Sequence, residues 1–228
     1  MKHVLDNPAW NALISGNKHL SNGDPKVKYF DKEVSPFVGL EDNFADSFRM
    51  LYEMIAPNEV RLFVTPAEIE IPAPWKVLNI IKGLQMVCAD IPEQATGGTT
   101  IIPLTEGHVS RMLSLTKLTN PGPFAERTID FGHYEGIFEG DKLVAMAGQR
   151  MHAFSYAEIS AVCTHPGHTG HGYARQLLLH QLHRIKEAGN IPFLHVRYDN
   201  ERAIKVYENL GFETRTEVYF YVIVNTLL

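Results

Sequence analysis

The stretch from Glu158 to Lys186 (EISAVCTHPGHTGHGYARQLLLHQLHRIK) constrains the fold more than any other part of the chain. Its first residues form an apolar run that predicts a buried strand, and Pro166 ends that strand because proline lacks a ladder donor. The glycines that follow let the backbone adopt positive φ and approach a bulky anion closely. Beyond Gly172, apolar side chains recur at helical spacing and predict an amphipathic helix. They are Ala174, Leu178, Leu182 and Ile185.

A strand, a glycine loop and a helix N-terminus in this order can bind an anion, because free N–H groups converge where the helix dipole is positive. The loop is not a Walker A motif, since no Gly-Lys-Ser/Thr follows it. It also lacks the G-x-G-x-x-G spacing of a dinucleotide site. Taken alone, the pattern fits a phosphate site and a plain structural turn equally well.

The next segments distinguish these two interpretations. Residues 191–198 predict a strand, and residues 200–210 predict a short helix that ends at Gly211. Together with the glycine loop, they resemble the GCN5-related N-acetyltransferase (GNAT) superfamily. Gly172-Tyr173-Ala174 matches the end of that family's R/Q-x-x-G-x-G/A loop, and a second motif, N-x-x-A-x-x-x-Y-x-x-x-G-F, is matched at every position. The matching residues are Asn200, Ala203, Tyr207, Gly211 and Phe212.

The resemblance covers roughly residues 99–224 and implies an α/β fold with a mixed, mostly antiparallel sheet flanked by helices. It predicts a GNAT domain at residues 97–228, preceded by an N-terminal α/β accessory region at residues 1–96. A degenerate second GNAT-like copy is the alternative for that region. The implied reaction moves an acetyl group from acetyl-CoA, the acyl-donor co-substrate, to a primary amine by direct transfer in a ternary complex.

The resemblance also implies which residues bind the cofactor. The backbone of the strand at residues 162–164 pairs with the pantetheine and supplies an oxyanion donor, and the loop holds the phosphates. Thr169 departs from the usual Arg or Gln, so we expect phosphate binding through the main chain, with help from the loop histidines. The predicted cofactor-binding residues are Val162, Cys163, Thr164, Thr169, Gly170, His171, Gly172, Tyr173, Ala174, Arg175, Asn200 and Ala203.

Two residues are predicted to be catalytic. Tyr207 occupies the position of the family's usual general acid, and a phenol with a pKa near 10 can protonate a departing thiolate. Its spacing alone favours a core tyrosine, and the resemblance reverses that interpretation. Glu158 is the candidate general base, with a solvated strand-end carboxylate as the alternative interpretation. Its rivals as the base are Glu135, His133 and His152.

Other side chains favour structural roles. Cys163 is expected to be a buried thiol, since no activating base can be identified beside it. The pairs His168-x-x-His171 and His180-x-x-His183 lack an HExxH or Cys-x-x-Cys context, so no metal site is expected. We expect His168 and His171 to lie on the anion side of the loop instead.

Composition limits the class of protein. A formal net charge of -5 without a basic stripe argues against nucleic-acid binding, and no 18-residue apolar run predicts a membrane span. Two cysteines in apolar surroundings indicate free thiols and a cytoplasmic protein. Three alternatives stay open: a non-catalytic CoA-binding sensor or interaction protein, an enzyme for longer acyl groups, and a homodimer.

The remaining pattern predicts the other elements. Residues 1–40 are expected to be loops and turns around a short helix at Trp10, and residues 91–98 a linker. A helix is expected at 41–55 with the stripe Phe44, Phe48, Leu51 and Ile55, and another at 105–118 with Val109, Met112 and Leu113 inward. The predicted strands are 60–65, 76–88, 99–104, 134–138, 143–151 and 212–224.

Overall fold

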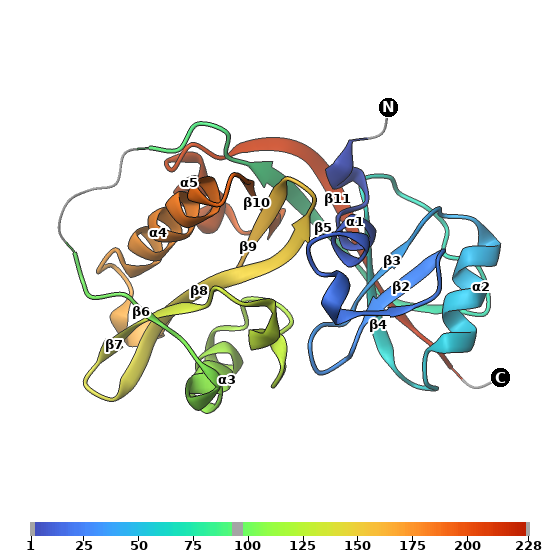
Figure 1. Cartoon of the computed structure of the whole chain (residues 1–228), viewed down its shortest axis with the longest axis horizontal. Coiled ribbons are helices and arrows are strands. Elements are labelled where there is room, and N and C mark those ends of the chain that lie inside the picture. Colours follow the sequence, from blue (N-terminus) through green and yellow to red (C-terminus); the bar gives the residue numbers. More distant parts are fainter. Residues whose placement is uncertain (1–2, 93–97, 227–228) are drawn as a thin grey trace.

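One continuous sheet organises the chain. The computed structural model describes residues 3–92 and 98–226. Within these ranges, eleven strands follow the order β1-β2-β3-β4-β11-β5-β10-β9-β8-β7-β6 (Figure 1). The pairs β3–β4 and β9–β10 are parallel and the others are antiparallel, which confirms the predicted mixed, mostly antiparallel sheet. The strands are β1 (Ser21–Gly23), β2 (Val27–Phe30), β3 (Phe37–Leu40), β4 (Val60–Thr65), β5 (Lys76–Val87), β6 (Ile102–Pro103), β7 (Glu135–Glu139), β8 (Lys142–Ala153), β9 (Tyr156–Thr164), β10 (Ile191–Arg197) and β11 (Glu213–Val224).

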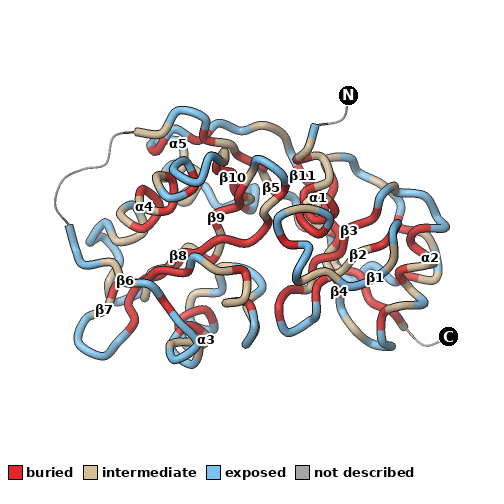
Figure 2. The backbone as a smooth tube through the Cα atoms, viewed as in Figure 1, coloured by how far each residue is buried: buried red, intermediate tan, exposed pale blue. Residues whose placement is uncertain are grey.

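Helices cover both faces of the sheet. One apolar cluster joins residues of α1 and α3 to the strands, and another joins α4 and α5 to the opposite face. In Figure 2 the inner sides of these elements are buried and the connecting turns are exposed. The helices are α1 (Pro8–Ile14), α2 (Ala45–Met54), α3 (Val109–Thr119), α4 (Tyr173–Glu187) and α5 (Glu201–Glu208), with short 3-10 helices η1 (Val4–Asp6), η2 (Lys18–Leu20), η3 (Glu106–His108), η4 (Thr128–Phe131) and η5 (Pro166–His168).

Strand β5 joins the two halves of the chain. It lies between β10 and β11, pairing with β10 over Gly83–Val87 and with β11 along most of its length. A strand from the N-terminal part of the sequence therefore completes the sheet built by the C-terminal part. The division of the chain at residues 96 and 97 stays a prediction.

Helix α1 connects the halves on one face of the sheet. It packs against β3 and also against β8, and Trp10 is buried at this junction. The contact with β3 depends on Gly39, because a Cβ at that position would lie 2.4 Å from the Cα of Trp10. The predicted short helix around Trp10 is thus confirmed. The expectation of loops elsewhere in residues 1–40 is wrong, since β1, β2 and β3 lie there.

Several element boundaries differ from the sequence predictions. The helix predicted at residues 41–55 begins at Ala45, since Asp42 accepts hydrogen bonds from the Phe44 N–H and the Ser47 hydroxyl and holds the preceding turn. Phe44 is 73% exposed and does not belong to the apolar stripe. The strand predicted at residues 99–104 is reduced to Ile102–Pro103, because proline cannot continue the ladder.

Helix α3 differs in part from its prediction, and the longer strands agree with theirs. In α3, Met112 is buried as predicted, but Val109 and Leu113 are half-buried and line an open groove, while Leu115 and Thr116 face inward. Strands β4, β5, β7, β8 and β11 lie where the sequence predicted strands. Of the predicted linker at residues 91–98, residues 93–97 lie outside the described part of the chain.

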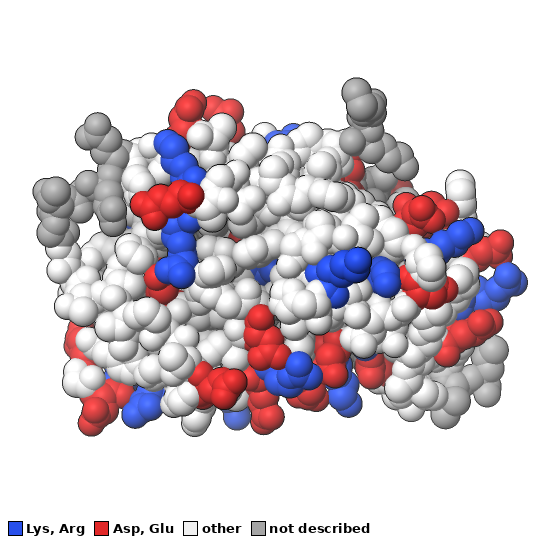
Figure 3. Space-filling view, in the orientation of Figure 1, with Lys and Arg blue, Asp and Glu red and all other residues white. Residues whose placement is uncertain are grey.

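The surface carries charged side chains of both signs. On the face drawn in Figure 3, basic and acidic side chains are interspersed and form no basic stripe. Among the described residues, no helix has the length and apolar character needed to cross a membrane. Cys88 and Cys163 are free and buried, as predicted.

The junction between α1 and β3 leads to a stability prediction. Gly39→Ala should lower the free energy of unfolding by about 1–3 kcal/mol, since the new methyl group collides with the backbone of Trp10. Urea unfolding measures this change. The control is Gly107→Ala, where the nearest atom lies 3.8 Å from the added Cβ. Equal effects of the two substitutions would contradict the close α1–β3 contact.

Candidate functional site

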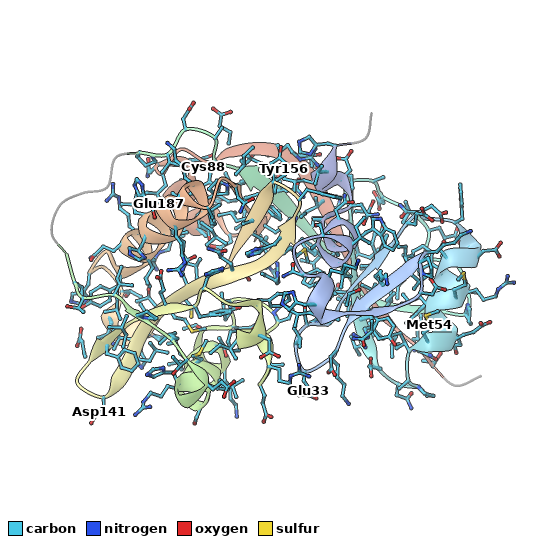
Figure 4. All side chains as sticks on the ribbon, in the orientation of Figure 1. Glu33, Met54, Cys88, Asp141, Tyr156 and Glu187 are labelled. Carbon is cyan, nitrogen blue, oxygen red and sulfur yellow. The ribbon has the colours of Figure 1, made fainter. Side chains whose placement is uncertain are left out.

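The site centres on the place where β9 and β10 separate. The two parallel strands pair only from Ile191 opposite Tyr156 to Phe193 opposite Glu158. Tyr156, labelled in Figure 4, marks the paired end of β9. Beyond Glu158, β9 has no ladder partner on the β10 side within the described residues, so the backbone of Val162, Cys163 and Thr164 is free on that side. The two strands thus separate beside the residues whose backbone is predicted to pair with the pantetheine.

A bulge shapes β9 at this opening. The register with β8 shifts between the pairs Gly148–Ser160 and Met146–Cys163, and Ala161 has φ 53°. Positive φ is uncommon for a residue with a Cβ, and bulges that carry it re-aim the backbone next to binding sites. Val162 consequently packs toward α4, whereas Ala161 and Cys163 pack on the opposite face.

The glycine loop meets the N-terminus of α4 as the sequence predicted. Gly170 has φ +87° and Gly172, the N-cap residue, has φ +76°. The loop residues Thr169, Gly170, His171 and Gly172 are all exposed, and so is Arg175 in the first turn. The first N–H groups of α4 therefore face outward at the end of β9, at the positive end of the helix dipole.

Tyr207 lies on α5 and faces the α4 side of the sheet. Its ring packs edge-on against Phe212 at 5.8 Å, in the same apolar cluster as Val162 and Ala203. Burial raises the pKa of Tyr207 to about 12, so the phenol stays protonated at neutral pH. Asn200 caps α5, because its side chain accepts a hydrogen bond from the Ala203 N–H at 3.2 Å.

Glu158 differs from the solvated carboxylate that the sequence allowed. It is fully buried, and Arg150 donates to both of its oxygens, from Nε at 2.8 Å and from a terminal nitrogen at 2.6 Å. His195 Nδ1 lies 2.7 Å from Oε1. Burial by itself would raise the pKa of Glu158, but the charge of Arg150 and the contact with His195 outweigh it and hold the pKa at about 2. A carboxylate bound in this way is a poor proton acceptor near neutral pH.

The contacts of Glu158 extend into a buried polar network. His195 Nε2 lies 3.0 Å from the side-chain nitrogen of Gln85, which also donates to the Leu5 carbonyl at 2.9 Å. The oxygen of Gln85 accepts from Arg215, whose other nitrogen pairs with Asp6 at 2.8 Å. A neutral His195 with its proton on Nδ1 satisfies every one of these contacts. The network thus crosses β8, β9, β10, β5 and β11 and reaches η1.

The rival bases lie elsewhere in the fold. Glu135 is buried and pairs with His180 at 2.7 Å and Arg184 at 3.1 Å, both on α4. His133 and His152 stack on each other, with ring centroids 5.8 Å apart. Burial lowers the pKa of His152 to about 4. These side-chain contacts are with α4 and between the two histidines, and none of them lies at the opening between β9 and β10.

A carboxylate that the sequence analysis missed approaches the loop. Glu139, from the hairpin whose tip is marked by Asp141 in Figure 4, accepts from the Tyr173 hydroxyl at 2.8 Å and lies 3.2 Å from His168 Nε2. His171 stacks on Tyr173 instead, with centroids 5.4 Å apart. To place Glu139 beside the glycine loop from the sequence, the register of the β7–β8 hairpin would have to be predicted residue by residue.

Burial raises the pKa of Cys163 to about 11, which fits a structural thiol rather than a nucleophile. The described residues contain no cluster of three His, Cys, Asp or Glu side chains suited to a metal. Two open grooves, of about 840 and 580 Å³, run along α3 and are not lined by the predicted CoA-binding residues.

Comparisons with known proteins agree with this geometry. A family model described as FR47-like protein matches residues 134–221, the part that holds β9, α4, β10 and α5. A solved structure from Novosphingobium aromaticivorans DSM 12444, assigned to the GNAT family, has a TM-score of 0.91 at 28% identity over 99% of this chain and 100% of its own. The chain belongs to the GNAT superfamily.

Other relatives of this GNAT chain show how far the likeness extends. It is 34% identical over 85 residues to N-alpha-acetyltransferase RimI of Mycobacterium tuberculosis (strain ATCC 25618 / H37Rv), which covers 36% of this chain. The chain spans about half, 52%, of that curated relative. A GCN5-related N-acetyltransferase from Kribbella flavida shares the fold, with a TM-score of 0.61 at 13% identity over 95% of each chain.

The environment of Glu158 leads to a prediction of stability against pH. Its pKa of about 2 lies below the ordinary value of about 4.3, so its contribution is present above that value and is lost as the pH falls toward 2. Glu158→Gln should lower the free energy of unfolding at pH 7 by about 3–5 kcal/mol, because Arg150 is left buried without its partner. The deficit should shrink as the wild type is acidified.

Urea unfolding between pH 7 and pH 3 measures both effects. Asp199→Asn is the control, since Asp199 pairs with Arg197 on the surface, where both side chains are 64% exposed. It should leave stability nearly unchanged. A Glu158→Gln protein as stable as the wild type but much slower in catalysis would restore Glu158 as the general base.

Proposed function

We propose that this GNAT chain transfers an acetyl group from acetyl-CoA to a primary amine, directly and within a ternary complex. The observation that carries the proposal is the opening between β9 and β10 beside the glycine-started helix α4. The free backbone at Val162–Thr164 can pair with an extended amide-bearing arm, and the N–H groups at the start of α4 can bind phosphates. Coenzyme A carries both kinds of group on one molecule.

The same backbone would stabilise the transition state. An N–H of β9 that is not used in a ladder is a fixed dipole, and a thioester carbonyl held against it gains stabilisation as its oxygen becomes negative. The bulge at Ala161 sets the direction of these groups before any ligand binds. We therefore assign Val162, Cys163 and Thr164 a backbone role, and their side chains a packing role.

Tyr207 is the proposed general acid. Its ring and Val162 belong to one apolar cluster, so the phenol and the proposed thioester site share one face of the sheet. With a pKa raised to about 12, the phenol retains its proton until it is given to the departing thiolate. We propose that Glu158 positions β9 through Arg150 and His195 and does not accept the proton of the amine.

The cofactor loop gives a binding prediction. Gly172→Ala should weaken acetyl-CoA binding at least tenfold in a calorimetric titration at pH 7, because a Cβ at φ +76° distorts the start of α4. Gly189→Ala is a matched control, since Gly189 also has φ +76° but lies beyond the opposite end of α4. Both variants should lose similar stability. Equal affinities in the two variants would place the phosphates elsewhere.

The general acid gives a kinetic prediction. Tyr207→Phe should lower kcat by about 10²–10⁴-fold, because the thiolate loses its proton donor, while acetyl-CoA affinity is retained. Release of CoA thiol in the presence of an amine measures the rate. Tyr198→Phe, at an exposed position just before the same helix, should behave as the wild type.

These experiments also separate the alternatives. Acetyl-CoA binding with no turnover on any amine would favour a CoA-binding sensor over an enzyme. A panel of acyl-CoAs would reveal a preference for longer chains. An unchanged kcat in Tyr207→Phe would remove Tyr207 from the mechanism while leaving the cofactor site in place.

A further inference from the structure

Half of β5 is a free sheet edge. β10 pairs with β5 only over Gly83–Val87, where Arg197 lies opposite Gly83. Within the described residues, β5 at positions 76–82 has a ladder partner on its β11 side alone. A free edge presents unpaired N–H and C=O groups to an additional strand.

This segment is exposed on both faces as well as at its edge. Neighbouring residues of a regular strand point to opposite faces, and Asn79 and Ile80, whose register with β11 is regular, are both exposed. Beyond the register shift that follows, Val77 and Leu78 are 36% and 50% exposed. Ile80 is 44% exposed. An apolar strand segment without cover on either face is unusual for a sheet that otherwise buries its aliphatic side chains.

The direction of the free main-chain groups follows from two hydrogen bonds. The Lys82 carbonyl accepts from the Tyr198 N–H at 3.1 Å, and Tyr198 directly follows β10. The Lys82 groups therefore point away from β11, and those of Ile80 share that direction because the register is regular between them. The Ile80 N–H is bonded at 2.9 Å to the side-chain oxygen of Asn79, which occupies the place of a neighbouring strand's carbonyl.

The edge borders the proposed active site. β9 and β10 separate after Glu158 and Phe193, and β10 then stops at Arg197. Beyond Gly83, β5 still pairs with β11, but it has no strand on the side that β10 occupied. A chain extended along the edge from Lys82 thus leads toward the opening at which the thioester is proposed to lie.

Charge distinguishes between two occupants of this edge. The segment could pair antiparallel with the same segment of a second copy, with Asn79 on the two-fold axis. In that register Lys76 of each copy would lie opposite Lys82 of the other copy. Like charges directly opposite each other destabilise a strand pair. The same two lysines attract the carboxylates of an acidic partner, so the edge suits a different chain better than a second copy.

We infer that the free edge of β5 binds the acceptor substrate, an extended acidic peptide that adds a strand beside residues 76–82 and directs its amine into the opening between β9 and β10. This inference rests on the function proposed above and specifies its acceptor as a peptide. Main-chain bonds would supply affinity with little sequence preference, and contacts with Val77, Leu78 and Ile80 would favour apolar side chains.

Peptide length tests the inference directly. The probes are octapeptides with a free α-amine, aliphatic residues and two glutamates, each compared with the dipeptide amide of its first two residues. Acetylated product is measured by mass spectrometry with the full chain and acetyl-CoA. At least tenfold higher kcat/KM for the octapeptides is expected. N-methylation of alternate peptide nitrogens should remove this gain, since it removes the strand-adding N–H groups without altering the protein.

A variant pair tests the edge itself. Ile80→Pro removes an N–H that the β11 ladder does not use, and proline is tolerated on such an edge. It should raise KM for the octapeptides at least tenfold and leave dipeptide turnover and acetyl-CoA affinity unchanged. Ile80→Val keeps the N–H and should behave as the wild type. If Ile80→Pro fails to fold, the N-methylated peptides still decide the question.

The contrary outcomes are distinct. Equal kcat/KM for octapeptides and dipeptides, with acetyl-CoA bound and turned over, would overturn this inference alone. Loss of a dimer in Ile80→Pro, seen by sedimentation with unchanged peptide kinetics, would assign the edge to a second copy. Absence of acetyl-CoA binding would overturn the proposed function and this inference together.

Discussion

The buried contact between Glu158 and Arg150 is the interaction on which the site depends. Glu158 is the last residue of β9 that pairs with β10, and the strands part immediately after it. Two nitrogens of Arg150 on β8 donate to the oxygens of Glu158 on β9 at 2.6 and 2.8 Å, in the interior. His195 on β10 contacts the same carboxylate, so the three strands are linked at this point. The opening therefore starts at Glu158, which is bonded to a side chain of the strand on each side of β9.

The anchor reaches the N-terminal part of the chain through Gln85 and Arg215. These two residues belong to β5 and β11, and they contact Leu5 and Asp6 of η1. Because every polar atom in this series of contacts needs its partner, displacement of η1 would leave the buried Gln85 amide short of a partner. Only β10 lies between Gln85 and the opening. The N-terminal residues thus support the geometry of the site without contributing a side chain to the proposed chemistry.

The strand β5 gives the fold its second constraint. By entering between β10 and β11 it makes one sheet from two halves, and by continuing past β10 it leaves an edge that borders the opening. Helix α1 contacts both halves on one face of the sheet, at β3 and at β8. Gly39 allows the backbone of α1 to lie against β3. The proposed acceptor surface thus lies where the two halves meet.

The sequence by itself determined the local elements of residues 158–212 and the family. The apolar strand, the glycines at positive φ and the amphipathic helix after Gly172 are local patterns, so residues 158–186 could be predicted without knowledge of the rest. The position of Tyr207 and the N-cap of Asn200 follow from a motif within a single helix. Only the tertiary structure decided the environment of Glu158, because its partners Arg150 and His195 come from different strands whose register no local pattern fixes. It also decided the approach of Glu139 to the loop and the place of β5, since long-range strand pairing depends on which buried surfaces fit together rather than on the propensity of any one segment.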